Sequence, residues 1–347
     1  MERVFELAGL LTALPSVSGY EEAAFKGLEE ICGDMFDEAF TNPAGSFVGI
    51  VRCGKPDAKA LILDAHLDEI GFIVSQVHDD GFLSVVNAGG VDTRVLPASE
   101  VTIYGKKAIR GIFTSKPPHL QSPGEADKKL ELKDIYIDTG MSGDELKKLV
   151  RIGDFAEIHS PLMRLKNNFA VSKSMDDKIC IAQIIRAIEL IDRDRLNIDI
   201  YCIFSGGEEI GGKGAATAAF AIDADWAVAL DVCNCRMPEG RNYLENIKPG
   251  DGSVISYSST TGRAVTTSLL SCAEDSGIKF QLRGEPGRTG TNAHYIQISR
   301  AGIPCTNLSV PLRYMHTGVE VISLEDVKTG AEIIARFAEK LGGDING

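Results

Sequence analysis

The sequence lacks any apolar run near the length of about 20 residues that a membrane-spanning helix requires. Its opening residues, Met1-Glu2-Arg3-Val4-Phe5, also lack the cationic segment followed by an apolar one that a signal peptide shows. No internal repeat or low-complexity tract is evident. We therefore expect neither a signal peptide nor a membrane span.

Basic residues are scarce relative to acidic ones. The chain has 36 lysines and arginines against 49 aspartates and glutamates, for a formal net charge of -13. A chain this acidic is repelled by phosphate backbones and anionic lipids. The composition therefore predicts that neither nucleic acid nor a membrane surface is the main partner.

Paired cysteines at zinc-finger spacing are missing as well. The eight cysteines are scattered, and Cys233 and Cys235 form the one close pair. Without a second such pair, we favour buried or loop thiols over a metal or redox site. Unpaired thiols fit a reducing compartment, so we expect a cytoplasmic protein.

With 347 residues, the chain exceeds the usual size of a single core, and two domains are expected. Residues 69–165 contain closely spaced short strand patterns and only one helix pattern, at 142–150. Such a block is typical of a small β-barrel or sandwich.

Outside that block, helix and strand patterns alternate. Strands are expected at 60–64, 198–204, 226–230 and 305–310, and the main helices at 3–13, 21–31, 177–191, 264–275, 293–301 and 324–341. Alternation of this kind predicts an α/β fold with a mostly parallel central sheet flanked by helices. We therefore predict a discontinuous α/β domain of residues 1–68 and 166–347, interrupted by an inserted β-barrel-like domain of residues 69–165.

Several side chains that can bind metal or move protons stand where a strand ends or a helix begins. They are His66 after strand 60–64, Glu208 and Glu209 after 198–204, Asp231 after 226–230, His316 after 305–310, and Asp176 before helix 177–191. Sites in open α/β sheets lie beyond the carboxyl ends of the strands, so these residues are expected to gather at one edge. Asp68, which follows His66 by two positions, can orient the imidazole.

The chemistry of these residues is that of a metal centre. Two histidines and three carboxylates form the mixed N/O set that suits Zn²⁺, Co²⁺ or Mn²⁺. One carboxylate bridging two ions about 3.5–4 Å apart makes a two-metal hydrolytic site. Such a site needs a base, and an unliganded glutamate beside a liganded one, as in Glu208-Glu209, can serve.

Eight segments spread over nearly the full length resemble one family. They are Val17-Ser18-Gly19-Tyr20-Glu21, His66-Leu67-Asp68-Glu69-Ile70-Gly71-Phe72, Lys116-Pro117-Pro118-His119, Met175-Asp176-Asp177-Lys178, Glu208-Glu209-Ile210-Gly211, Leu230-Asp231-Val232, Gly290-Thr291-Asn292-Ala293 and Arg313-Tyr314-Met315-His316. In this order, they resemble the M42 metallo-aminopeptidases, the glutamyl and leucyl aminopeptidases of the tetrahedral type, of which some members are labelled endoglucanase.

The resemblance implies a role for each position. It implies that Asp176 bridges two divalent ions, most readily zinc or cobalt. His66 and Asp231 would complete one metal site, and Glu209 and His316 the other. Glu208 would be the general base, with Asp68 orienting His66. The β-rich insertion would be a dimerisation domain, and the protein a homo-oligomer built from dimers, up to a dodecamer.

The chain departs from the family pattern at one position near the site. Gly290-Thr291-Asn292-Ala293 stands where the family usually has Gly-Thr-Asp-Ala, so a carboxylate is lost. We expect Asn292 to touch substrate, with His294 as a second residue lining the pocket. We interpret Asp177, which follows the bridging Asp176, as a structural residue.

The leading hypothesis is therefore a metal-dependent aminopeptidase that removes the N-terminal residue from peptides. A glycoside hydrolase is the rival enzyme class, but it would use two carboxylates and no metal pair. A non-catalytic homologue with an altered site is the second rival. The complete set of metal ligands argues against it, whereas Asn292 keeps it open.

Overall fold

The computed structural model describes residues 1–122, 124, 130–238, 240 and 246–342. Its α-helices are α1 (Glu2–Thr12), α2 (Glu22–Cys32), α3 (Gly143–Leu149), α4 (Met175–Leu190), α5 (Lys213–Ile222), α6 (Arg263–Asp275), α7 (Ala293–Ile296) and α8 (Leu324–Lys340). None of the helices in these ranges is both long enough and apolar enough to cross a bilayer.

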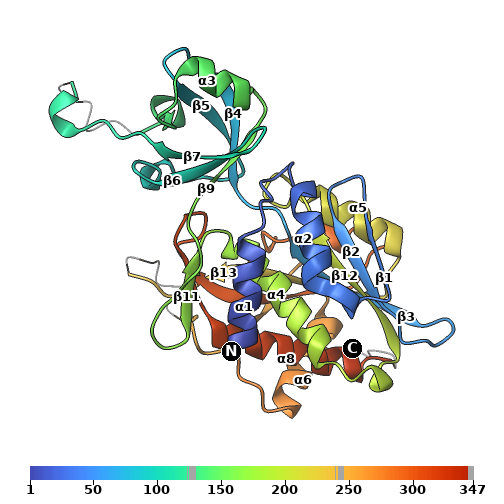
Figure 1. The fold of residues 1–347 in the computed structure, drawn as a ribbon. Helices are drawn as coiled ribbons and strands as arrows, with labels where there is room; N and C mark the ends of the chain where they lie inside the picture. The colour runs from blue at the N-terminus through green and yellow to red at the C-terminus, as the bar shows by residue number, and fades with distance from the viewer. Residues whose placement is uncertain (123, 125–129, 239, 241–245, 343–347) are drawn as a thin grey trace.

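The strands fall into two sheets (Figure 1). The large sheet contains β1 (Glu38–Thr41), β2 (Phe47–Val51), β3 (Lys59–His66), β10 (Met163–Arg164), β11 (Phe169–Ser172), β12 (Ile198–Ser205), β13 (Trp226–Asn234), β14 (Ser253–Ser258), β15 (Phe280–Glu285), β16 (Cys305–Arg313) and β17 (Glu320–Ser323). The second sheet contains β4 (Gly71–Val77), β5 (Phe82–Ala88), β6 (Glu100–Tyr104), β7 (Ala108–Phe113), β8 (Ile137–Asp138) and β9 (Phe155–Ile158).

The large sheet has a parallel centre, and most of its outer strands pair antiparallel. Strands β12, β3, β13 and β16 lie side by side and run parallel. The outer pairs β1–β2, β16–β17 and β11–β17 are antiparallel. The predicted α/β class is thus confirmed, and the sheet as a whole is mixed. Strands β1, β10, β11 and β17 were not predicted, because each is only two to four residues long and too short to show a periodic hydrophobic pattern.

Helices cover both faces of this sheet. Side chains of α1, α2, α4, α6 and α8 pack on one face, where they form the largest hydrophobic core. Helices α5 and α7 pack on the other face against small residues such as Ala227 and Ala229 of β13. Buried on both sides, the central strands read as almost continuous apolar runs, which is why their positions could be predicted.

Strands β4 to β9 close into a six-stranded antiparallel barrel, in the order β4-β5-β8-β7-β6-β9. The barrel has its own core, which includes Phe72, Phe113 and Leu146, and it stands away from the α/β part (Figure 1). The predicted β-barrel-like insertion is confirmed. Its helix α3 begins with a capping box between Ser142 and Glu145.

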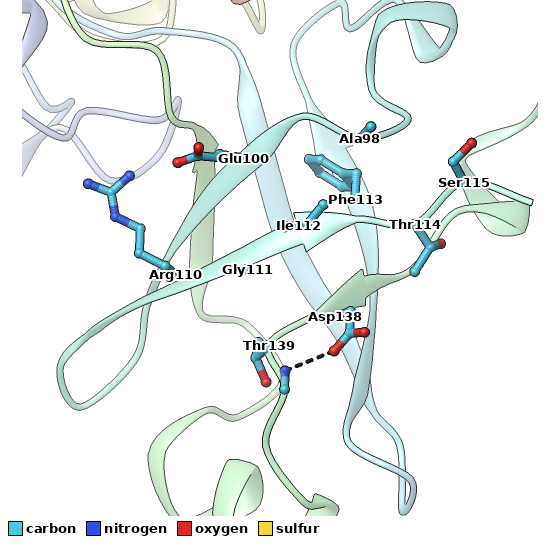
Figure 2. A pocket seen from close by; sticks show the side chains of 11 residues that line it. Ala98, Glu100, Arg110, Gly111, Ile112, Phe113, Thr114, Ser115, Asp138 and Thr139 are labelled. Atoms are coloured by element: carbon cyan, nitrogen blue, oxygen red, sulfur yellow. Dashed lines mark hydrogen bonds between the residues drawn. The ribbon is translucent and has the colours of Figure 1, made fainter.

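The outer wall of the barrel carries a hollow of about 680 Å³ over β6, β7 and β8 (Figure 2). Glu100, Arg110 and Ile112 line it, and the side chain of Ile112 is largely exposed. This hollow lies on the barrel, whereas the candidate metal ligands all belong to the α/β part.

Ser18 and Glu21 have the Ser-x-x-Glu spacing of a capping box, but no capping box forms at the start of α2. Glu21 is itself the N-cap of α2 and makes no side-chain cap to the helix. Ser18 instead donates its hydroxyl to Asp68 Oδ2 at 2.6 Å. The Ser-x-x-Glu spacing was misleading because a tertiary partner competes for the serine.

Candidate metal centre

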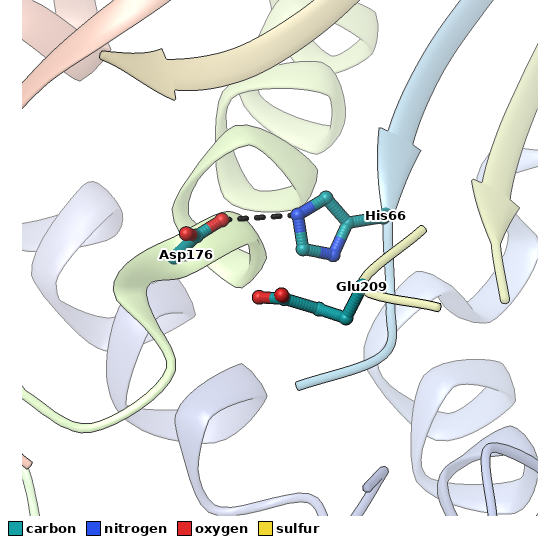
Figure 3. Close-up of side chains that lie close together, drawn as sticks. All are labelled: His66, Asp176 and Glu209. Carbon is teal, nitrogen blue, oxygen red and sulfur yellow. Dashed lines mark hydrogen bonds and ion pairs between the residues drawn. The ribbon is translucent and has the colours of Figure 1, made fainter. Parts of the chain in front are cut away.

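His66 is the last residue of β3, and its ring is fixed from both sides. Nε2 lies 3.0 Å from Oδ1 of Asp176. Nδ1 lies 2.8 Å from the carbonyl oxygen of Asp68 and 3.6 Å from the carboxylate of the same residue. The nearer partner of the imidazole is therefore the backbone of Asp68, and Nε2 points at the carboxylate of Asp176 (Figure 3).

The carboxylate of Asp68 organises the loop after β12. It accepts the backbone N–H groups of Glu208, at 2.9 Å, and of Glu209, at 3.2 Å. Gly207 and Gly211 in this loop have positive φ, which only glycine adopts without strain. This arrangement brings Glu209 alongside His66 and Asp176 (Figure 3).

Asp176 lies at the bent start of α4, where its own φ and ψ are not helical. Its backbone N–H donates to the buried carboxylate of Glu320 at 3.0 Å. His316 approaches from the loop after β16, with Nε2 3.4 Å from Asp176 and 3.3 Å from Glu209. Glu320 also accepts the N–H of His316 at 2.8 Å, so a single carboxylate fixes the backbone of both residues.

Asp231 lies within β13 and not after it, because the strand continues to Asn234. Ligand atoms of His66, Asp177 and Asp231 lie within 4.8 Å of one another, as do those of His66, Asp176 and Glu209. The carboxylate of Asp177 therefore lies beside two of the predicted metal ligands, His66 and Asp231. Its Oδ2 accepts the N–H of His66 at 3.2 Å, while Oδ1 has no partner within the described residues.

The predicted ligands line one cavity of about 250 Å³. Its lining includes all five of them, His66, Asp176, Glu209, Asp231 and His316, together with Glu208. Residues that the sequence did not single out also line it, among them Arg283, Glu285 and Thr289. The alternation of β15 could have placed Arg283 and Glu285 on one face, but nothing in the sequence pointed that face at the site.

Crowding of carboxylates perturbs their protonation. Burial and the neighbouring carboxylates, Glu209 first, raise the pKa of Glu208 to about 7. Burial and the charge of Asp177 raise the pKa of Asp231 well above its usual range. Hydrogen bonds to Asp176 and Glu209 raise the pKa of His316 to about 10.

These shifts mean that the acidic groups cannot all be ionised at neutral pH unless cations join them. The unpartnered oxygen of Asp177, the paired histidines and the clustered carboxylates fit divalent metal ions of the zinc or cobalt type.

Asn292 and His294 do not belong to this group. The amide of Asn292 donates to Asp64 Oδ2 and to Ser205 Oγ, both at 2.8 Å, and the residue is buried. His294 lies on α7 with its ring against Tyr295. Neither residue is among those that line the cavity in the described part of the chain.

An α/β sheet that gathers histidines and carboxylates at the carboxyl ends of its parallel strands has the layout of a metal-dependent hydrolase. Residues 45–333 match the M42 glutamyl aminopeptidase family, and the chain belongs to that family. The predicted membership and the prediction of an aminopeptidase-class hydrolase are therefore confirmed.

Relatives and solved structures agree with this membership. The chain is 31% identical over 342 residues to the lysyl aminopeptidase of Pyrococcus furiosus, with 97% of each chain covered. It is 30% identical to the aminopeptidase APDkam598 of Desulfurococcus kamchatkensis, with a TM-score of 0.90 over 98% of this chain and 95% of the other.

Two further solved structures are relevant to oligomeric assembly and to the alternative of a glycoside hydrolase. The TET1 peptidase of Pyrococcus horikoshii, which can assemble into a tetrahedron or a large octahedral shell, is 28% identical, with a TM-score of 0.85 over 97% of this chain and 100% of the other. A Thermotoga maritima protein named endoglucanase is 26% identical, with a TM-score of 0.77 over 95% and 96%.

Proposed function

We propose that this chain is a di-metal aminopeptidase that hydrolyses the first peptide bond of its substrate. The observation that supports the proposal most strongly is that five separated residues, His66, Asp176, Glu209, Asp231 and His316, line one cavity with Glu208 beside them. Asp176 would bridge two ions, with His66 and Asp231 on one and Glu209 and His316 on the other. When bound, zinc or cobalt ions polarise the scissile carbonyl and lower the pKa of an attacking water.

Glu208 would accept the proton of the attacking water and pass it to the departing amine. Burial and the neighbouring carboxylates raise the pKa of this side chain, so it takes up a proton more readily than an exposed glutamate does. The C–N bond breaks, and a free amino acid and a peptide one residue shorter leave. Asp68 would position both a metal ligand and the general base, because its carbonyl oxygen holds the ring of His66 and its carboxylate holds the Glu208-Glu209 loop.

The same proposal covers where and in what form the protein works. All eight cysteines, each within the described ranges, are free thiols, which supports a reducing cytoplasmic location. The assemblies named for the TET1 peptidase support a homo-oligomer for this chain, built from dimers and reaching a dodecamer, with peptides as substrates.

Glycoside hydrolysis has weaker support. It uses two carboxylates flanking a sugar bond, and the histidines of the centre would have no part in it. The non-catalytic alternative rested on Asn292, which is bonded to Asp64 and Ser205 and is not among the residues that line the cavity. An aminopeptidase gives a role to more of the residues that line the cavity than either alternative function does.

A panel of aminoacyl-p-nitroanilides tests the proposal. We expect hydrolysis that a chelator abolishes and that added Zn²⁺ or Co²⁺ restores. The same anilides with an acetylated amino group are the matched control and should not be cleaved. Hydrolysis that survives chelation, equal cleavage of the acetylated substrates, or activity confined to carboxymethylcellulose would overturn it.

A further inference from the structure

The barrel reaches the metal centre through one short loop. Strand β5 ends at Ala88, and Gly89 and Gly90 follow it. A Cβ atom on Gly90 would lie 3.1 Å from Nδ1 and 3.5 Å from Cε1 of His316. A Cβ atom on Gly89 would lie 3.3 Å from Cβ of Glu209. This loop of the inserted barrel therefore packs directly on two predicted metal ligands.

These two ligands are the ones that lie in loops. His66 is the last residue of β3, and Asp231 lies within β13, so the central sheet holds the backbones of both. Glu209 follows β12 and His316 follows β16, and these two would share one metal ion. The barrel loop thus contacts the pair of ligands whose backbones the sheet does not hold.

The ring of His316 has little freedom to move away from the loop. The residue has a φ of +63°, a left-handed conformation that is uncommon outside glycine and persists only where surrounding contacts enforce it. Its N–H donates to the buried carboxylate of Glu320 at 2.8 Å. Its Nε2 lies 3.3 Å from Glu209 and 3.4 Å from Asp176. The ring therefore lies between these carboxylates and Gly90.

The loop is fixed as well. The side-chain amide of Asn87 donates to the carbonyl oxygen of Gly89 at 2.7 Å. A Cβ atom on Gly89 would also lie 2.8 Å from Cγ2 of Ile70, where the chain passes from the α/β part into the barrel. Non-bonded heavy atoms prefer separations of about 3.5–4.0 Å. A methyl group on Gly90 would therefore press on the ring of His316, because neither side can give way freely.

Resting on the proposed function, we infer that the inserted barrel forms one wall of the metal site of Glu209 and His316, and that Gly90 is the positioning residue of that wall. Because Gly90 has no side chain, the ring of His316 can keep Nε2 among the metal-binding carboxylates. The other proposed ion, between His66 and Asp231, does not depend on this loop.

Removal of zinc from the loaded protein by a chromophoric chelator tests this inference. The wild type should release two ions per subunit. In Gly90→Ala, one ion should be held as in the wild type and the other about 10- to 100-fold more weakly, the usual effect of disturbing an outer partner of a metal ligand. Hydrolysis of the best anilide substrate should fall at low zinc and return as zinc is raised, because the general base is untouched.

The variant is expected to fold. Gly90 is exposed and is not among the glycines with positive φ, so alanine fits its backbone and the thermal midpoint should stay close to that of the wild type. Gly262→Ala is the matched control for an added methyl group. Gly262 has a φ of −68°, and its Cβ would lie 3.4 Å from the backbone nitrogen of Cys305, its nearest contact. This control should keep both ions at wild-type affinity.

A second variant tests the same loop without adding an atom. Asn87→Ala removes the hydrogen bond that holds the carbonyl oxygen of Gly89. It should weaken the same single ion by a smaller factor than Gly90→Ala does. If Gly90→Ala does not fold, Asn87→Ala decides the question alone, and unchanged zinc binding in it would overturn the inference.

Wild-type affinity for both ions in folded Gly90→Ala, or equal weakening of both, would overturn the assignment of Gly90. A wild type that holds fewer than two ions or cleaves no anilide would overturn the proposed function and this inference with it. Two ions and cleavage in the wild type, with unchanged zinc binding in Gly90→Ala, would overturn the inference alone.

Discussion

Oε1 of Glu69 lies 2.7 Å from Nζ of Lys178, and both side chains are almost completely buried. The other carboxylate oxygen of Glu69 lies 2.6 Å from Nζ of Lys173, which also contacts Glu157 of the barrel strand β9 at 3.1 Å. Glu69 lies where the chain leaves the α/β part for the barrel, and Lys173 lies where it has returned. A buried cluster of two lysines and two glutamates therefore joins the barrel to the segment that carries Asp176.

Removing the charge of Glu69 should destabilise the protein strongly. Glu69→Gln would leave two buried ammonium groups without a full counter-charge, which costs about 3–5 kcal/mol. Urea unfolding of the wild type and the variant measures the difference. Glu38→Gln is the control, because Glu38 pairs with Arg52 at the surface and should cost at most about 1 kcal/mol. A loss in Glu69→Gln no larger than in Glu38→Gln would show that the cluster contributes little.

Glu157 should make this cluster sensitive to pH. Burial and the nearby charge of Glu69 raise the pKa of Glu157 to about 7. In the unfolded chain its pKa returns to about 4.3. The folded state thus holds this proton more tightly, and the resulting stabilisation, complete below about pH 4.3, is lost as pH rises towards 7.

Glu157→Gln cannot ionise and serves as the reference for that effect. We expect the free energy of unfolding of the wild type, relative to Glu157→Gln, to fall as pH is raised from about 5 to about 8. Chemical denaturation at several pH values measures this difference. A constant difference, or one that grows with pH, would contradict the assignment.

Asp68 is expected to affect catalysis without binding metal itself. Its carboxylate accepts the N–H groups of Glu208 and Glu209, and an asparagine there would turn its NH₂ group towards a donor. Asp68→Asn should lower kcat by about 10- to 100-fold, the usual cost of losing a supporting partner at a metal site. Ser18→Ala, which removes only the hydroxyl that Asp68 also accepts, is the milder control. A kcat in Asp68→Asn that matches this control would show that the loop holds its place without the carboxylate.

Asn292 is expected to contribute stability and not substrate affinity. Its amide donates to Oδ2 of the buried Asp64 and to Oγ of Ser205, both at 2.8 Å. Asn292→Ala would leave Asp64 without this partner, at a cost of about 1–3 kcal/mol. Thermal or urea unfolding should show the loss, while KM stays close to the wild-type value. A raised KM with unchanged stability would restore the sequence-based expectation that Asn292 touches substrate.

The position of the metal centre could be predicted because several of its residues occupy the same kind of place in the fold. His66, Glu209 and His316 each stand at or beyond the end of a parallel central strand, and such ends share one edge of the sheet. Buried parallel strands are long apolar runs, so their ends are visible in the sequence. Asp231 was placed just after its strand because a carboxylate interrupts the apolar pattern, although β13 continues to Asn234.

The rest of the site depends on contacts between residues far apart in the chain. The hydrogen bond from Asn292 to Asp64 links the start of α7 to β3, and no local sequence pattern predicts it. Ser18 lies in a capping-box spacing, but its hydroxyl binds Asp68. Arg283 lies on β15, and only the folded sheet shows which face of that strand meets the cavity.

We propose that Glu208 acts as the general base of a metal centre whose ions are held by other residues. The most direct measurement is kcat for Glu208→Gln together with the metal content of the same preparation. We expect kcat to fall by about 100- to 10,000-fold, as for loss of a general base, while two metal ions per subunit and the thermal midpoint are retained. Near-normal hydrolysis in this variant would exclude Glu208 as the base, and loss of metal along with activity would show that Glu208 is a ligand.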